Sequence, residues 1–182
     1  MLRCWSGWLC AAALVCGSPA FICLALAFVA WRPAWGQTAP PANTTLRIIG
    51  KVERPLVLSE VDLQALPRTR LAVTDEKGTP VTYDGVPVVE LLRRAGVPLG
   101  KQLRGPQMKL YVIVNAADGY RVVFALAEFD PDFTDRAIIL ADHRDGHVLA
   151  PPEAPFRMIV AGEKRHARWV REVNSLDVEE AR

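Results

Sequence analysis

The chain has 182 residues, of which 23% are charged, and its formal net charge is +2 at pH 7. Residues 1–36 contain Arg3 and Arg32 but no acidic residue, and removing these two from the 22 basic residues leaves 20, against 20 acidic ones. The remainder is therefore nearly neutral, which argues against nucleic-acid binding, because such binding normally requires a net basic face.

Residues 1–36 are predicted to be a secretory signal peptide. An almost continuous apolar run from Trp8 to Trp31 follows the basic start, and the small-x-small sequence Ala34-Trp35-Gly36 predicts cleavage before Gln37. The run is long for a signal peptide, so an uncleaved membrane anchor is the alternative. Either interpretation exports the rest of the chain and predicts a periplasmic or secreted location, with membrane contact only through an uncleaved leader.

Cysteine placement limits what the exported part can do. All four cysteines lie in the leader, at Cys4, Cys10, Cys16 and Cys23. The exported part therefore has neither disulfides nor thiolate metal ligands, and its stability must come from a packed core, for which roughly 140 residues suffice. We expect a linker over residues 37–45, one domain over 46–178 and a charged tail over 179–182.

The first half of this domain is predicted to contain short strands and two short helices. The strands are expected at Leu46–Val52, Leu71–Thr74 and Val81–Tyr83. Ser59, with Asp62 three residues later, predicts the capped start of a helix that ends at Pro67. Pro87 predicts the start of a second helix, which Gly96 closes. The dipeptide Asp84-Gly85 is interpreted as a turn.

The stretch Leu110–Leu126 predicts a hairpin, because two alternating apolar runs meet at the turn dipeptide Asp118-Gly119. Its apolar residues on both faces favour a central position covered on both sides. The remaining expected elements are a helical turn at Ala125–Phe129 and strands at Ala137–Ala141 and Phe156–Ala161, and Trp169–Val178 is expected to end the domain. Strands dominate without a βαβ rhythm, so the predicted fold is α+β, with a mixed, mostly antiparallel sheet and few short helices.

The common catalytic motifs G-x-S-x-G, G-x-x-x-x-G-K-[ST] and H-E-x-x-H are absent from the sequence. His143 and His147 flank a turn together with Asp142 and Asp145, but this spacing matches no established metal site, and a solvated hairpin tip is the better explanation. In the hairpin, three side chains are candidates for more than packing: Asn115, Asp118 and Tyr120.

The segment Gly162–Arg171 is a candidate anion-binding site. It combines one histidine with four basic residues beside a tryptophan, namely His166, Lys164, Arg165, Arg168, Arg171 and Trp169. Arginine suits phosphate or carboxylate because its planar fork donates two parallel hydrogen bonds. The alternative is a solvated surface segment that Trp169 anchors in the core.

Four stretches in order, LRIIGKVERPLVLSEVDLQALP, VTYDGVPVVELLRRAGV, NAADGYRVVFALAE and APFRMIVAGEKRHARWVREV, resemble the oxidoreductase molybdopterin-binding domain of the sulfite oxidase family. The resemblance covers nearly all of Leu46–Val178. It implies an α+β fold of mixed sheets, a molybdenum-pterin cofactor, and oxygen-atom transfer such as sulfite oxidation or sulfoxide reduction. The family's Arg-Ser-Val-Lys-Trp sequence, which contacts the pterin and its phosphate, corresponds here to Arg165, His166, Ala167, Arg168 and Trp169.

One departure from the family concerns the metal. The family bonds molybdenum through one protein cysteine, whose position falls near Val73 or Thr74, yet no cysteine follows Cys23. The leader also has single arginines, whereas export of a folded cofactor protein usually needs a twin-arginine signal.

We therefore expect an exported binding module without molybdenum catalysis, whose partner is a small anion or an exported or membrane protein. No cofactor is expected, although the resemblance admits molybdopterin. The alternatives are an active molybdenum oxidoreductase with a cysteine-free metal site and a purely structural partner domain. The candidate ligand-binding residues are Arg165, His166, Arg168, Asn115, Asp118 and Tyr120.

Overall fold

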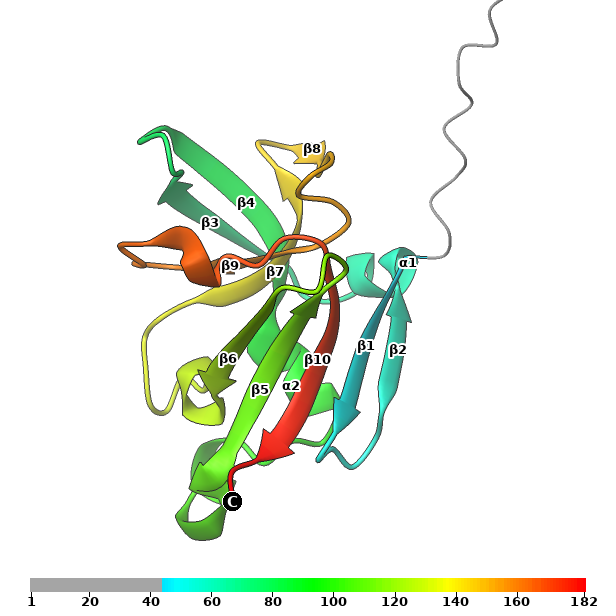
Figure 1. Ribbon diagram of the computed structural model, residues 1–182, viewed down its shortest axis with the longest axis vertical. Helices are drawn as coiled ribbons and strands as arrows, with labels where there is room; N and C mark the ends of the chain where they lie inside the picture. Colours follow the sequence, from blue (N-terminus) through cyan, green and yellow to red (C-terminus); the bar gives the residue numbers. More distant parts are fainter. Residues whose placement is uncertain (1–43) are drawn as a thin grey trace, which may run out of the picture. The chain divides into compact units, whose positions relative to one another are not determined.

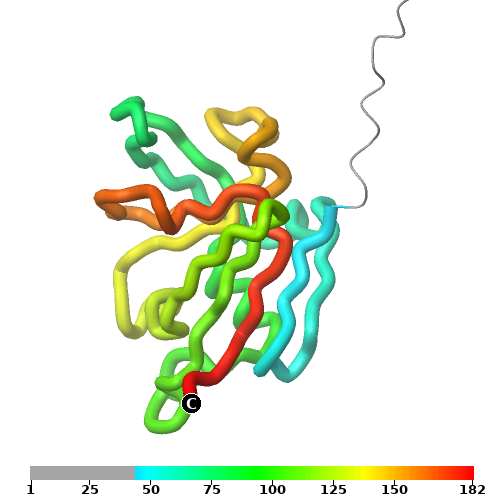
Figure 2. Tube along the Cα trace, viewed as in Figure 1, coloured from blue at the N-terminus to red at the C-terminus, as the bar shows by residue number. Residues whose placement is uncertain are grey.

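The computed structural model describes residues 44–182, whose strands form two β-sheets (Figure 1), and Figure 2 traces the same chain as a tube. The predicted signal peptide and nearly all of the predicted linker lie outside the described residues. Within the part of the chain that the structure describes, no helix has the length and apolarity that a membrane span requires.

The first sheet, sheet A, has five strands in the order β2-β1-β10-β5-β6. Its strands are β1 (Thr45–Gly50), β2 (Leu56–Ser59), β5 (Leu110–Ala116), β6 (Arg121–Ala125) and β10 (Val173–Glu180). Strand β10 runs parallel to β1 and antiparallel to β5, so the last strand of the chain is the middle strand of the sheet. It also extends through Glu180, two residues into the predicted charged tail.

The predicted hairpin is confirmed, with Val114 opposite Val122 on β5 and β6. Val112 and Val114 are fully buried, as the alternation predicts. The expected cover on both faces is wrong, because β6 is an edge strand and Val123 on its outer face is 57% exposed. One face of an antiparallel sheet can remain solvated, so the apolar residues on β6 did not require a second layer.

The second sheet, sheet B, has the order β3-β4-β7-β8, and β9 also pairs with β7. Its strands are β3 (Thr69–Thr74), β4 (Pro80–Pro87), β7 (Ile138–Arg144), β8 (His147–Val148) and β9 (Arg157–Val160). The turn predicted at Asp84-Gly85 is wrong, because both residues lie inside β4, at a register shift against β7. Gly85 is required there, since a Cβ at this position would run into the backbone of Leu140 and Ala141.

Two short α-helices and several 3₁₀ turns connect the strands. They are α1 (Glu60–Gln64), α2 (Val88–Arg94), η1 (Gly100–Gln102), η2 (Gly105–Lys109), η3 (Leu126–Phe129) and η4 (His166–Arg168). The predicted capping box of α1 is confirmed, because Ser59 N donates to Asp62 Oδ2 at 2.8 Å and Asp62 N donates to Ser59 Oγ at 3.3 Å. Helix α2 lies behind sheet A in Figure 1 and buries Val88, Leu91 and Leu92.

One continuous apolar core joins the two sheets. Sheet A contributes residues such as Ile48 and Leu176, and sheet B contributes Tyr83 and Ile159, and all four side chains are fully buried. Each large side chain buried in this way contributes roughly 1.5–3 kcal/mol. The α+β class with mostly antiparallel, mixed sheets is therefore confirmed.

Candidate functional site

A cleft lies between the end of β3 and the segment that precedes and includes η4. It consists of two adjoining hollows that share Asp75 and Trp169. The larger, of about 410 Å³, is lined by Ala72, Val73, Thr74, Asp75, Ala161, Gly162, Glu163, Lys164, His166 and Trp169. The smaller, of about 220 Å³, is lined by Asp75, Glu76, Lys77, Arg144, Pro152, Glu153, Arg157, Trp169 and Arg171. We call the two hollows together the β3–η4 cleft.

Trp169 forms an aromatic wall between the two hollows. It is only 5% exposed, and its indole Nε1 donates a hydrogen bond to the carbonyl of Val160 at 3.0 Å. The ring of His166 stacks on it with centroids 3.9 Å apart, and Tyr83 meets it edge-on at 6.0 Å. Trp169 therefore anchors the basic segment in the core and also fixes the position of His166 in the cleft.

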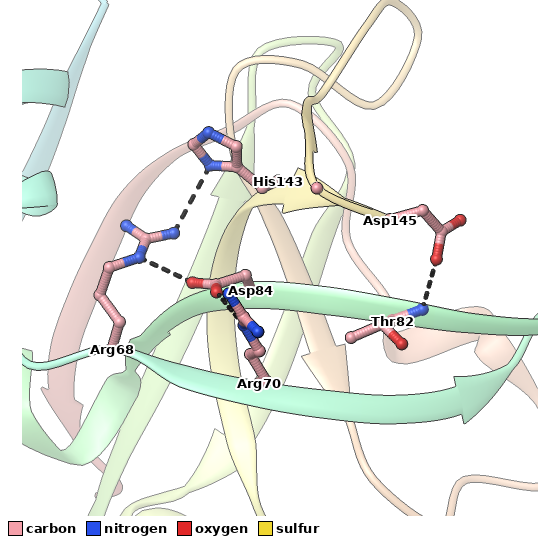
Figure 3. A pocket seen from close by; sticks show the side chains of 7 residues that line it. Arg68, Arg70, Thr82, Asp84, His143 and Asp145 are labelled. Atoms are coloured by element: carbon pink, nitrogen blue, oxygen red, sulfur yellow. Dashed lines mark hydrogen bonds and ion pairs between the residues drawn. The ribbon is translucent and has the colours of Figure 1, made fainter.

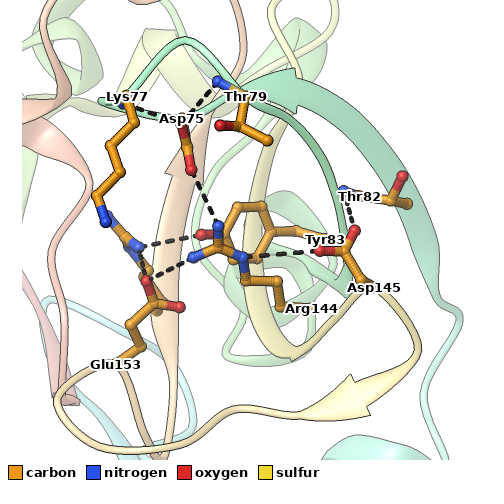
Figure 4. A network of polar contacts seen from close by, with 9 residues as sticks. Asp75, Lys77, Thr79, Thr82, Tyr83, Arg144, Asp145 and Glu153 are labelled. Atoms are coloured by element: carbon orange, nitrogen blue, oxygen red, sulfur yellow. Dashed lines mark hydrogen bonds and ion pairs between the residues drawn. The ribbon is translucent and has the colours of Figure 1, made fainter.

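The smaller hollow contains a network in which two arginines share one carboxylate. Arg144 Nη1 donates to Glu153 Oε1 at 3.2 Å and Nη2 donates to Asp75 at 3.1 Å, as Figure 4 shows. Arg157 Nη1 also donates to Glu153 Oε1, and to the Tyr83 hydroxyl at 3.0 Å. Two guanidinium groups from different strands of sheet B therefore converge on a single carboxylate oxygen.

Arg157 is unusual because it is a charged residue in the core. Its side chain is 8% exposed, and its guanidinium lies 5.7 Å from the Tyr83 ring centroid and 5.5 Å from that of Trp169. Cation–π contacts of this kind help to hold a desolvated arginine. Its Nε is buried and has no hydrogen-bond partner within the described residues. Such an unpartnered donor is costly, so the site has more donor capacity than the protein itself uses.

Asp75 and Tyr83, two members of this network, have shifted pKa values. The pKa of Asp75 is lowered mainly by the backbone N–H of Thr79, with help from Lys77 N–H and Arg144. The pKa of Tyr83 is raised, chiefly because burial disfavours the phenolate. Asp75 is therefore ionised and Tyr83 neutral, and the arginines can offer charge-assisted hydrogen bonds to an oxyanion.

The residues predicted for ligand binding do not lie together in the structure. His166 lines the cleft, whereas Arg165 is exposed and lines neither hollow. Arg168 donates to Glu128 Oε2 at 2.7 Å and to Glu163, and its pKa is raised mainly by the hydrogen bond with Glu163. Arg168 is therefore engaged by two carboxylates and does not face the cleft as the free main donor that the charge pattern suggested.

The hairpin candidates lie elsewhere. The hydroxyl of Tyr120 donates to the carbonyl of Ala167 at 2.8 Å and so supports η4 from outside the cleft. Asp118 accepts a hydrogen bond from Tyr120 N at 2.9 Å and shapes the turn. Asn115 donates to Ser175 and Asp177 on neighbouring β10, both at 2.9 Å. Neither Asp118 nor Asn115 lines the β3–η4 cleft.

Sequence reasoning missed Arg144 and Arg157, two of the three arginines that line the cleft, whereas Arg171 belongs to the predicted basic segment. One signal was present, because Arg157 interrupts the otherwise apolar stretch Phe156–Ala161, and a charge in a buried strand needs partners. No comparable pattern identified Arg144, which sits at the polar end of β7. Its role depends on Asp75 and Glu153, which the fold brings in from other loops.

A second charged cluster lines a separate hollow of about 550 Å³ on sheet B (Figure 3). Arg68 donates to Asp84 at 2.7 Å and to Asp142 at 3.0 Å, and Arg70 donates to Asp84 at 3.0 Å. Burial alone would raise the pKa of Asp142, but hydrogen bonds from Arg68 and His143 outweigh it and lower that pKa. These charges satisfy one another, so the cluster acts as a clamp between β3, β4 and β7.

His143 and His147 lie on the β7–β8 hairpin, whose turn is Asp145-Gly146. Across residues 44–182, no three His, Cys, Asp or Glu side chains are grouped as a metal site requires. The pairing of β7 with β8 around that turn is what agrees with the interpretation of the stretch as a hairpin tip.

Comparisons of the sequence and of the structure with known proteins indicate the same family. Residues 35–182 match the family described as the oxidoreductase molybdopterin binding domain. A similar solved structure is the sulfane dehydrogenase SoxCD from Paracoccus pantotrophus, with 25% identity and a TM-score of 0.59. The alignment covers 75% of this chain but only 38% of that chain. No curated protein matches significantly. Because the family match spans most of the sequence and the fold agrees, the chain belongs to the oxidoreductase molybdopterin-binding domain family, of the sulfite oxidase type.

Proposed function

We propose that this chain is a binding domain that holds a small oxyanion in the β3–η4 cleft and carries out no molybdenum chemistry. The observation that supports it most is the convergence of Arg144 and Arg157 on one carboxylate, that of Glu153. Two guanidinium groups that already hold a carboxylate have the spacing and charge that another oxyanion requires.

The residues of the cleft do not fit the family's molybdenum centre. By resemblance, the metal-binding cysteine belongs near Val73 or Thr74, and both residues line the larger hollow beside His166. A methyl group or a hydroxyl does not replace a soft thiolate, which fixes the geometry and the potential of the metal. The proposed function therefore includes no reaction at molybdenum.

The size and charge of the smaller hollow favour a small ligand. Its volume of about 220 Å³ is below the roughly 300–1,000 Å³ that is typical of sites for drug-sized molecules. Its lining includes Lys77, Arg144, Arg157 and Arg171, against Asp75, Glu76 and Glu153. A compact anion such as sulfate or phosphate matches this excess of donors better than an extended organic cofactor does.

A molybdenum-dependent oxidoreductase is the second candidate, and family membership is the observation that favours it. The similar SoxCD structure is that of a sulfane dehydrogenase, although this chain spans only 38% of that protein's length. This candidate requires a metal site built without a protein thiolate.

Metal analysis and anion titration distinguish the two candidates. Protein purified from molybdenum-replete cells is expected to contain far less than one molybdenum per chain, and its melting temperature should rise with sulfate at constant ionic strength. Arg144→Met should abolish that rise, whereas Arg121→Met, on the exposed edge strand β6, should keep it. One molybdenum per chain with turnover would support the second candidate, and no anion effect on the wild type would overturn the proposal.

A further inference from the structure

We propose that Glu153 determines which anions the β3–η4 cleft accepts, because its carboxylate is a built-in competitor that restricts the site to divalent oxyanions. This inference rests on the proposed oxyanion-binding function. It identifies the ligand class and a specificity-determining residue of the same site.

Glu153 occupies the site through one oxygen only. Its Oε1 accepts hydrogen bonds from Arg144, at 3.2 Å, and from Arg157. Arg157 Nε keeps no partner in the described chain, so the carboxylate leaves part of the buried donor set unsatisfied. A tetrahedral oxyanion presents more acceptor oxygens than a shared carboxylate oxygen and can satisfy more of these donors.

Charge balance explains why the ligand must be divalent. Asp75 holds Arg144 from the other side at 3.1 Å, so Asp75 and Glu153 together neutralise Arg144 and Arg157. A monovalent anion that displaces Glu153 only restores this balance, and it competes against a carboxylate of high effective concentration. A divalent anion brings one further negative charge, which Lys77 and Arg171 on the same lining can attract.

The attachment of Glu153 allows this exchange. It belongs to the loop between β8 and β9, where its N–H donates to the Ala150 carbonyl at 2.9 Å. Its own carbonyl accepts from Glu172 N at 3.5 Å, a long contact. The side chain is 18% exposed, so it can rotate toward solvent without breaking a strand pairing.

The test compares Glu153→Gln with a matched control, Glu90→Gln. Glu90 also accepts from two arginines, Arg93 at 2.7 Å and Arg94 at 3.0 Å, and is 21% exposed, but it lies on α2 and lines no part of the cleft. The purified full chain is titrated calorimetrically with sodium sulfate and sodium nitrate at constant ionic strength. If the carboxylate holds both arginines about 90% of the time, freeing them raises the apparent affinity about tenfold.

Glu153→Gln should therefore bind sulfate about tenfold more tightly and should gain measurable nitrate binding, whereas Glu90→Gln should behave like the wild type. Equal or weaker sulfate binding by folded Glu153→Gln, with binding intact in the wild type, would overturn the role of Glu153 and leave the proposed function standing. Absence of sulfate binding in the wild type would instead refute the proposed function. If Glu153→Gln does not fold, Glu153→Asp replaces it, because aspartate is one methylene shorter and holds the two arginines less well. Glu153→Asp should still bind sulfate more tightly than the wild type. An unchanged sulfate affinity would count against the role of Glu153 as a competitor.

Discussion

Replacing Arg68 with methionine removes the guanidinium that joins three elements of sheet B. Arg68 precedes β3 and donates to Asp84 on β4 at 2.7 Å and to Asp142 on β7 through both terminal nitrogens. Removing one partner of a buried ion pair costs about 3–5 kcal/mol. The Arg68 side chain is 26% exposed and that of Asp142 is 12% exposed, so solvent screening reduces this cost. We expect the free energy of unfolding to fall by about 2–3 kcal/mol.

The cost should depend on pH in a defined direction. Against the opposing effect of burial, the hydrogen bonds from Arg68 and His143 lower the folded-state pKa of Asp142, so its contribution to stability is complete above the ordinary pKa of an aspartate, about 4. That contribution is lost as the pH falls through the lowered pKa. In Arg68→Met, the hydrogen bonds from Arg68 no longer oppose the effect of burial on the pKa of Asp142. Its carboxyl group therefore protonates at a higher pH than in the wild type. The difference in stability should therefore be constant at neutral pH and shrink in acid.

Urea denaturation at several pH values measures this difference. The melting temperature of the variant at pH 7 should fall by roughly 6–10 °C for a domain of this size. Arg70→Met is the matched control, because Arg70 contacts only Asp84 of this clamp, at 3.0 Å, and its side chain is 81% exposed. It should cost at most about 0.5–1 kcal/mol. Equal losses in the two variants, or a loss in Arg68→Met that persists unchanged in acid, would refute the clamp.

Two further predictions concern the fold and the leader. Gly85→Ala should lower the free energy of unfolding by about 2–3 kcal/mol or more, because its methyl group meets the backbone of Leu140 and Ala141. Gly78→Ala, where nothing lies within 4 Å of the added Cβ, should cost about 1 kcal/mol because of its positive φ. Thermal melting compares the two variants, and equal losses of stability would contradict the steric explanation. Export of the chain predicts a mature protein that begins at Gln37, which N-terminal sequencing of the exported form checks, and recovery of the full-length chain in membranes would favour the anchor instead.

Local chemistry explains which elements could be predicted. The helix start at Ser59 and the hairpin turn at Asp118-Gly119 are encoded within four residues and formed as expected. Asp84-Gly85 has the same turn chemistry but lies inside β4, because Gly85 is there to let β7 approach closely. A dipeptide pattern does not distinguish a turn from a close approach of two backbones.

The pairing of distant strands was outside the reach of local patterns. Arg47 and Ser175 are partners in sheet A although they are 128 positions apart. The cleft has the same origin, since Asp75 comes from the turn after β3, Arg144 from the end of β7 and Glu153 from the loop between β8 and β9. The charge pattern identified Arg168 as a donor, but it could not reveal that Glu128 and Glu163 would bind it.

The position of β10 has a consequence for how the protein is made. β10 is the last strand in the sequence and lies between β1 and β5, so the β1–β2 and β5–β6 hairpins have no strand to join them until Val173–Glu180 has been synthesised. Isolated hairpins are marginally stable in water, and long-range pairing is slow to form. Sheet A therefore stays incomplete until β10 has been synthesised, and the two hairpins cannot gain their shared neighbour before that point.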